Sequence, residues 1–198
     1  MSTTIGILLF PNAEELDFAG PWEVFTMSSH LRNDVRVVTI AQTREPVRCA
    51  KGLRVIPDHS FDDAPDLDVV LVPGGVGTTV EIDNPVLIEW LRKAGARCTW
   101  VTSVCTGSQL LYGSGFARGK RITTHWTFID TLRQIAPDAT VLERIRYVRD
   151  GNVVTSAGVS AGIDMALWVA GQLWGAETAR AIQRFMEYDP APPYSAEV

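Results

Sequence analysis

Residues 99–108 read TWVTSVCTGS, and this short stretch decides the fold. Its first seven residues are almost all apolar or β-branched, which is typical of a strand. A strand without alternating polar residues is buried on both faces, as in a parallel sheet. The apolar run ends at Cys105, and the small residues that follow open a segment with helical spacing. We therefore predict an α/β protein in which this strand is central and Cys105 lies at its carboxyl end.

The same alternation of strand and helix extends over the rest of the sequence. Strands are predicted at Ile5–Phe10, Val35–Ile40, Asp68–Pro73, Thr99–Cys105, Arg121–Thr124 and Asn152–Ser156. Helices are predicted at Pro21–Leu31, Pro85–Ala96, Thr106–Phe116, Trp126–Ala136, Ala161–Trp174 and Ala176–Glu187. A small hairpin is expected from Val47–Cys49 and Arg54–Ile56. Proline favours the first turn of a helix, so the first helix is expected to begin at Pro21.

Length and composition indicate one domain and exclude several classes of protein. The sequence has 198 residues, a mass of 21.7 kDa and a formal net charge of −5. We expect a single domain over residues 1–198, with residues 189–198 as an extended, Pro-rich tail. An acidic protein lacks the basic surface that nucleic-acid binding needs. No apolar run reaches the roughly 18 residues of a membrane span, and the N-terminus lacks the charged start of a signal peptide. A cytoplasmic location is therefore expected.

Cys105 is the residue that points most clearly to chemistry. A thiol at the start of a helix is expected to have a lowered pKa, which makes it a better nucleophile. The order of strand, cysteine and small residues also resembles the sharp turn that presents a nucleophile above a sheet. The alternative is that Cys105 is a buried small hydrophobe, as free cysteines usually are. Cys49 and Cys98 are expected to be structural, because an odd number of cysteines without CxxC spacing favours neither disulfides nor a thiolate metal site.

Other candidate residues follow other strands, at the edge of the sheet where ligands bind in open α/β folds. Asp17 has apolar neighbours whose burial would raise its pKa until it can donate a proton near neutrality. The alternative for Asp17 is a helix cap or a structural acceptor. His125 is a weaker candidate, because a histidine at a strand end is usually structural. The glycine-rich turn 74–77 and the Thr106 N–H are expected to stabilise negative charge.

Together these segments resemble the ThiJ/PfpI superfamily and, within it, the isocyanide (isonitrile) hydratases. The matching segments are IGILLFPNAEELDFAGPWEVF (5–25), LDVVLVPGGVGT (67–78), VTSVCTGSQLL (101–111), GKRITTHW (119–126), ERIRYVRDGNVVTSAGVSAGIDMAL (143–167) and EYDPAPPY (187–194). The resemblance implies a flavodoxin-like, doubly wound sheet with helices on both faces, as in domains related to class I glutamine amidotransferases. It also implies a homodimer.

The resemblance assigns roles to individual residues. Cys105 matches the nucleophile, Asp17 the acidic partner and Thr106 the residue that follows the nucleophile in the hydratases. Gly74 and Gly75 match the loop on the oxyanion side. PfpI-type peptidases carry histidine after the cysteine, and many other members carry glutamate in place of Asp17. The residues found here therefore disfavour protease, glyoxalase and deglycase activities.

The function expected from the resemblance is the conversion of an isocyanide and water to an N-substituted formamide, without metal or other cofactor. The Cys105 thiolate would add to the terminal carbon while the nitrogen acquires a proton from Asp17. Water guided by Asp17 or by the Thr106 hydroxyl would then release the formamide from a thioimidate intermediate. The residues expected to form an apolar pocket for a small, uncharged substrate are Val76, Trp126 and Val159.

Two other functions stay open. The first is a ligand-sensing domain like those of AraC-type regulators, although such regulators need a further helix-turn-helix region of about 100 residues. The second is a glyoxalase-like or stress-response member of the superfamily, for which methylglyoxal turnover is the discriminating test.

Overall fold

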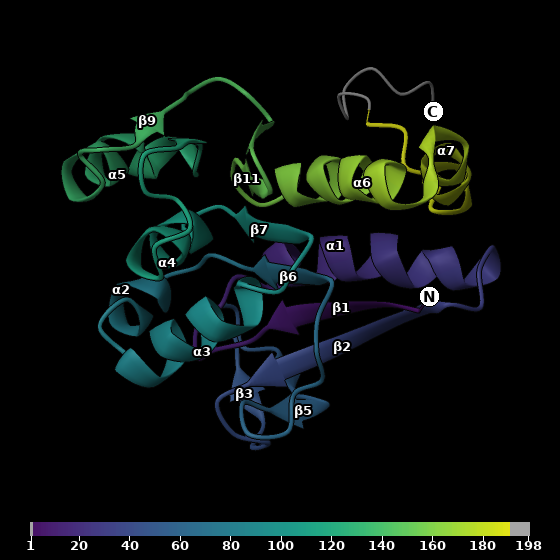
Figure 1. Cartoon of the computed structure of the whole chain (residues 1–198), viewed down its shortest axis with the longest axis horizontal. Helices are drawn as coiled ribbons and strands as arrows, with labels where there is room; N and C mark the ends of the chain where they lie inside the picture. Colours follow the sequence, from purple (N-terminus) through teal and green to yellow (C-terminus); the bar gives the residue numbers. More distant parts are fainter. Residues whose placement is uncertain (1, 191–198) are drawn as a thin grey trace.

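A seven-stranded sheet forms the centre of the molecule (Figure 1). The computed structural model describes residues 2–190, and its main sheet has the strand order β10-β11-β7-β6-β1-β2-β5. The bounds are β1 Thr3–Leu8, β2 Val35–Ala41, β5 His59–Ser60, β6 Val69–Val72, β7 Trp100–Val104, β10 Tyr147–Asp150 and β11 Val153–Ser156. Neighbouring strands are parallel except for β10 and β11. The predicted α/β class with a mostly parallel sheet is confirmed.

Two short strand pairs lie outside this sheet. Antiparallel β3 (Val47–Arg48) and β4 (Arg54–Val55) form the predicted hairpin. The strand predicted at Arg121–Thr124 is wrong in extent and place, because only β8 (Arg121–Ile122) forms and it pairs with β9 (Thr140–Val141). The edge strand β10 is not among the predicted strands.

Most of the helices cover the sheet in two groups (Figure 1). The bounds are α1 Glu15–Met27, α2 Thr78–Glu81, α3 Pro85–Gly95, α4 Gly107–Gly113, α5 Ile129–Ile135, α6 Ala161–Trp174 and α7 Ala176–Phe185. Helix α6 packs against both α1 and α7, whereas α2, α3 and α4 form a separate group beside β6 and β7. None of the helices between residues 2 and 190 is long and apolar enough to cross a membrane. Residues 191–198 of the predicted tail lie outside the described part of the chain.

Helix α1 corrects one expectation that matters for the site. It begins at Glu15, six residues before the predicted start, and Pro21 lies inside it. Proline cannot donate a hydrogen bond to the carbonyl four residues earlier, which here belongs to Asp17. Packing against α6 holds the helix together at this point: a Cβ added to Gly20 would lie only 2.8 Å from Ile163 Cγ1. Asp17 is therefore in the first turn of α1 and not in a loop.

Candidate active site

Four segments meet at the carboxyl edge of the sheet. Because β1, β6, β7 and β11 are parallel, the residues that follow them all emerge on the same side. Asp17 follows β1, the turn 73–77 follows β6, Cys105 follows β7, and residues 157–159 follow β11. The structure thus brings together most of the residues that the sequence predicts for the site.

Cys105 occupies a strained turn between β7 and α4. Its φ of 56° lies in the left-handed region, which residues other than glycine rarely adopt. The backbone N–H of Cys105 donates to Ser156 O and to Ala157 O, each at 3.2 Å, and this shared bond ties the turn to the end of β11. Cys105 is only 7% exposed. Strain of this kind persists only where surrounding contacts enforce it, and it is common at functional sites.

Asp17 is a fully buried carboxyl group beside this turn. Its Oδ2 accepts a hydrogen bond from Gly74 N at 2.8 Å, whereas its buried Oδ1 has no hydrogen-bond partner. Burial raises the pKa of Asp17 to about 7, and the nearby charge of Glu14 adds to this shift. Hydrogen bonding from Gly74 opposes the rise in pKa, and the proximity of the Cys105 thiol and the Val159 backbone opposes it to a smaller extent. The predicted rise of the Asp17 pKa towards neutrality is therefore confirmed.

The thiol and the carboxyl group influence each other directly. Burial raises the pKa of Cys105 to about 12, and the charge of Asp17 raises it further, while hydrogen bonds from the Thr106 and Val159 backbones lower it. The expected lowering of this pKa is thus wrong, because desolvation outweighs the donors around the sulfur. A thiol of this kind needs a base to remove its proton, and Asp17 is the titratable group beside it.

The glycine turn after β6 has a different role from the predicted one. Gly74 N–H donates to Asp17, and Gly75 N–H donates to Thr106 Oγ1 at 3.0 Å. These two N–H groups are already used, so they hold site residues in place and are not free to stabilise a substrate anion. Glycine is required for this close approach, since a Cβ on Gly74 would lie 2.6 Å from Thr106 N. The donors that remain beside the sulfur are the backbone N–H groups of Thr106 and Val159.

Val159 and Val76 border the site in different ways. Val159 is half-buried and has a φ of 51°, which is strained for a β-branched side chain. Its backbone lowers the pKa of both Asp17 and Cys105. Val76 is 69% exposed and lies at the surface of the turn. Neither residue is enclosed in an apolar pocket of the kind expected from the sequence.

His125 and Thr124 differ in how they relate to Cys105. The His125 ring is within hydrogen-bonding distance of Thr127, with Nδ1 to Oγ1 at 2.8 Å, so it caps the turn 126–128 and has no bond to the thiol. Its ring also lies against Gly158, where an added Cβ would be 2.0 Å from Cδ2. Thr124, which the sequence reasoning missed, donates from Oγ1 to Cys105 O at 2.8 Å. Its place in the TTHW segment was the available signal.

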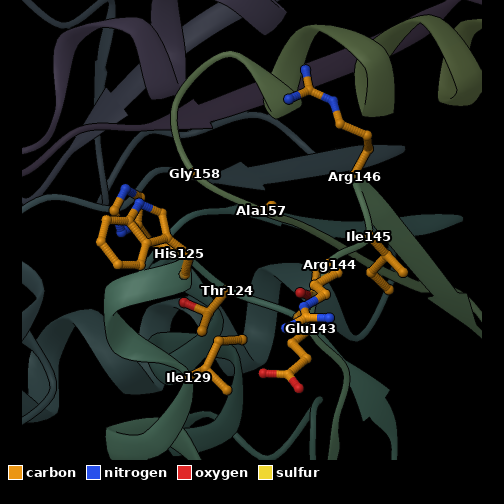
Figure 2. A pocket seen from close by; sticks show the side chains of 11 residues that line it. Thr124, His125, Ile129, Glu143, Arg144, Ile145, Arg146, Ala157 and Gly158 are labelled. Carbon is orange, nitrogen blue, oxygen red and sulfur yellow. The ribbon is translucent and has the colours of Figure 1, made fainter.

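A cavity of about 490 Å³ lies next to the Cys105 turn (Figure 2). Its lining residues are Thr123, Thr124, His125, Trp126, Ile129, Glu143, Arg144, Ile145, Arg146, Ala157 and Gly158. Thr124 and Ala157 both bond to the backbone of Cys105, but neither the thiol nor Asp17 lines the cavity. Figure 2 shows Arg146 pointing away towards α6, where it pairs with Asp164. The cavity is an open, partly charged space beside the backbone of Cys105.

Metal ligation is not a feature of the described site. Within residues 2–190, no group of three or more His, Cys, Asp or Glu side chains is arranged to hold a metal ion. Cys49 and Cys98 are buried free thiols, as expected for structural cysteines.

A family model described as DJ-1/PfpI matches residues 3–172. The chain belongs to the DJ-1/PfpI family. It is 40% identical over 196 residues to the isonitrile hydratase of Pseudomonas putida, covering 99% of this chain and 83% of that protein. A solved ThiJ/PfpI family protein from Pseudomonas syringae has a TM-score of 0.90 and 32% identity, covering all of this chain and 80% of that one. The chain is also 30% identical to the transcriptional regulator GbdR of Pseudomonas aeruginosa, over 94% of this chain but only 51% of the regulator.

Proposed function

We propose that this protein is an isocyanide hydratase in which Cys105 is the nucleophile and Asp17 is its proton-transfer partner. The observation that carries the proposal is the pairing of a strained, buried thiol with a buried carboxyl group that has one unpaired oxygen. The similarity to the isonitrile hydratase of Pseudomonas putida extends over nearly the whole chain and supports the same reaction.

The first step joins the sulfur to the isocyanide carbon. Above pH 7 Asp17 is ionised and the thiol keeps its proton, because the pKa values of the two groups lie near 7 and 12. Asp17 accepts the thiol proton as sulfur attacks the terminal carbon, and then delivers that proton to the same carbon. The product is the thioimidate R–N=CH–S–Cys105. Atom balance therefore places this proton on carbon and not on nitrogen, which corrects the expectation from the sequence.

The second step hydrolyses the thioimidate. Water adds to its carbon, with Asp17 or the Thr106 hydroxyl positioning the water, and the nitrogen receives a proton. Cleavage of the C–S bond then expels the thiolate and leaves R–NH–CHO. Asp17, which is a carboxylate after the first step, accepts the hydroxyl proton as the carbonyl group forms and then returns it to the expelled sulfur. The sum is one isocyanide plus one water giving one formamide. No electrons are transferred in either step, and the reaction is proposed to run without a cofactor.

The environment of the pair favours a small, uncharged substrate. The adjoining cavity offers Ile129, Ile145 and the 80% exposed Trp126 as apolar surface for the substituent on nitrogen. The lining also carries charged side chains, among them the neighbouring Glu143 and Arg144 (Figure 2). We propose that the substituent occupies this cavity and that the isocyano group lies beside the Cys105 thiol and Asp17.

A single domain, a homodimer and a cytoplasmic location complete the proposal. Leu16 and Trp22 are each 40% exposed on α1, and a second copy of the chain would cover them. The free thiols of all three cysteines fit a reducing compartment.

Ligand sensing is the second candidate, because the chain also resembles the part of GbdR that it covers. A sensor would bind its ligand without turnover. The discriminating observation is therefore whether the bound molecule is released unchanged.

The test is formamide production from cyclohexyl isocyanide, measured by chromatography. Cys105→Ala is expected to remove turnover, whereas Cys98→Ala, which changes another buried cysteine, is expected to keep at least half of it. Turnover by Cys105→Ala would contradict the assignment of the nucleophile. A reduced wild-type protein that makes no formamide would contradict the proposed function, and methylglyoxal turnover or tight binding without turnover would then identify which alternative holds.

A further inference from the structure

Two buried polar side chains lie behind Thr106 and have no part in the mechanism above. Gln109, on α4, is 4% exposed, and Thr78, at the start of α2, is fully buried. Gln109 Nε2 donates to Thr78 Oγ1 over 2.6 Å, and the hydroxyl oxygens of Thr78 and Thr106 are 3.1 Å apart. Burying an amide and a hydroxyl group is costly compared with apolar residues of similar volume. We call this pair the Gln109–Thr78 relay.

The donors and acceptors of these groups set the direction of the relay. Because the Gln109 amide donates to Thr78, Thr78 sends its only proton either to Gly75 O at 2.8 Å or to Thr106 Oγ1 at 3.1 Å. Gly75 N–H also donates to Thr106 Oγ1. When Thr78 donates to Thr106 as well, the Thr106 oxygen accepts two hydrogen bonds and its own proton is left for a third group.

Two acceptors compete for the Thr106 proton. One is Gly75 O at 3.2 Å. The other is the Cys105 sulfur, because Thr106 Oγ1 and Cys105 Cβ lie 2.7 and 2.8 Å from the same point, the position of a Cβ added to Gly74. The Thr106 hydroxyl also lowers the pKa of Cys105. An ionised sulfur is the stronger acceptor of the two. We propose that Gln109 and Thr78 are positioning residues that direct the Thr106 proton to Cys105 Sγ while the sulfur is negatively charged. This inference rests on the proposed function only in assuming that the thiolate forms during catalysis.

The experiment measures alkylation of Cys105 by iodoacetamide as a function of pH, by peptide mass spectrometry. The double variant Thr78→Val/Gln109→Leu removes both partners together, so neither is left buried without a hydrogen bond. The pKa of Cys105 is expected to rise by about one unit, which lowers the alkylation rate about tenfold at a fixed pH below the pKa. Asp17 is unchanged in this variant, so its effect on the thiol cancels in the comparison. Thr78→Ser keeps the hydroxyl group and is expected to stay within about twofold of the wild type.

The outcomes separate this inference from the proposed function. A folded double variant with the wild-type alkylation profile would overturn the relay, as would a Thr78→Ser protein that behaves like the double variant. If the double variant does not fold, Gln109→Met is measured by the same criterion. If the alkylation profile of the double variant is shifted while the wild-type protein makes no formamide, the relay is supported and only the hydratase proposal is refuted. Formamide production with an unshifted profile refutes the relay alone.

Discussion

Replacing Asp17 by asparagine is expected to stabilise the protein above pH 7 while removing its activity. The carboxyl group is fully buried, and its ionised form leaves one oxygen without a hydrogen bond. Asparagine has nearly the same shape, keeps an oxygen for the Gly74 N–H, and carries no charge to desolvate. It cannot accept the thiol proton, so turnover is expected to fall to the level of Cys105→Ala.

The size of the effect follows from the pKa of Asp17. Burial raises this pKa from 3.8 to about 7, so between these values the folded protein binds a proton that the unfolded chain has released. Stability contributed by this group is therefore complete below pH 3.8 and is lost as the pH rises through about 7. A shift of about three units corresponds to about 4 kcal/mol in the free energy of unfolding. Asp17→Asn has no carboxyl group at this position, so its free energy of unfolding does not fall as the pH rises through about 7.

The assay is urea unfolding followed by tryptophan fluorescence at several values between pH 4 and pH 8. The stability difference between Asp17→Asn and the wild type is expected to grow in favour of the variant by about 4 kcal/mol over this range. Asp130→Asn, an exposed control on α5, is expected to change stability by less than about 0.5 kcal/mol at every pH. A constant difference between Asp17→Asn and the wild type would refute the reasoning, because the carboxyl group would then titrate alike in both states.

Three further predictions concern the surroundings of the pair. Because the charge of Glu14 raises the pKa of Asp17, Glu14→Gln is expected to lower the pH midpoint of turnover. Lys51→Met leaves Glu14 without its ion-pair partner and is expected to raise this midpoint. The prediction is contradicted if the pH–rate profiles of the two variants move in the same direction. Gly75→Ala is expected to destabilise the fold by about 2 kcal/mol or more in urea unfolding, since its φ is 115° and the new Cβ would lie 2.5 Å from the Glu14 backbone nitrogen; a neutral result would count against this conformation of the turn. Val159→Gly is expected to relieve about 1 kcal/mol of backbone strain and so to raise the melting temperature. The same change is expected to lower turnover, because the backbone N–H of residue 159, which lowers the pKa of Cys105, is then held less firmly. Unchanged turnover would argue against a role for this N–H.

The sequence was sufficient to predict that Cys105 and Asp17 come together at the carboxyl edge of the sheet. Cys105 ends a strand that is apolar on both faces, and a buried parallel strand has its carboxyl end at the ligand-binding edge of the sheet. Asp17 has apolar neighbours, so a raised pKa could be predicted without coordinates. Both inferences depend on which residues are apolar and on the alternation of strands and helices, and both features can be recognised in the sequence.

The start of α1 could not be predicted, because it depends on a contact between distant segments. Proline at position 21 is a strong local signal for a helix start, yet packing of Gly20 against Ile163 on α6 keeps the helix intact through it. The predicted direction of the pKa shift of Cys105 was wrong for a similar reason. The position at the start of a helix is visible in the sequence, whereas the degree of burial of the sulfur is a property of the assembled site.

The use of the glycine N–H groups was also beyond local reasoning. A glycine-rich turn predicts free backbone donors, but Gly74 and Gly75 donate to Asp17 and Thr106, which arrive from two other segments. The tertiary structure decides which groups accept these hydrogen bonds. The same glycine-rich sequence is therefore compatible with binding a substrate anion and with holding Asp17 and Thr106 in place.

The central claim is that Cys105 forms a covalent bond to the isocyanide carbon, with Asp17 managing the proton. The most direct measurement is mass spectrometry of the wild-type protein quenched in acid during turnover of cyclohexyl isocyanide. We expect an adduct with the mass of one isocyanide on the peptide that contains Cys105, and none on the peptides of Cys49 or Cys98. Formamide that accumulates while Cys105 stays unmodified at every quench time would contradict the account.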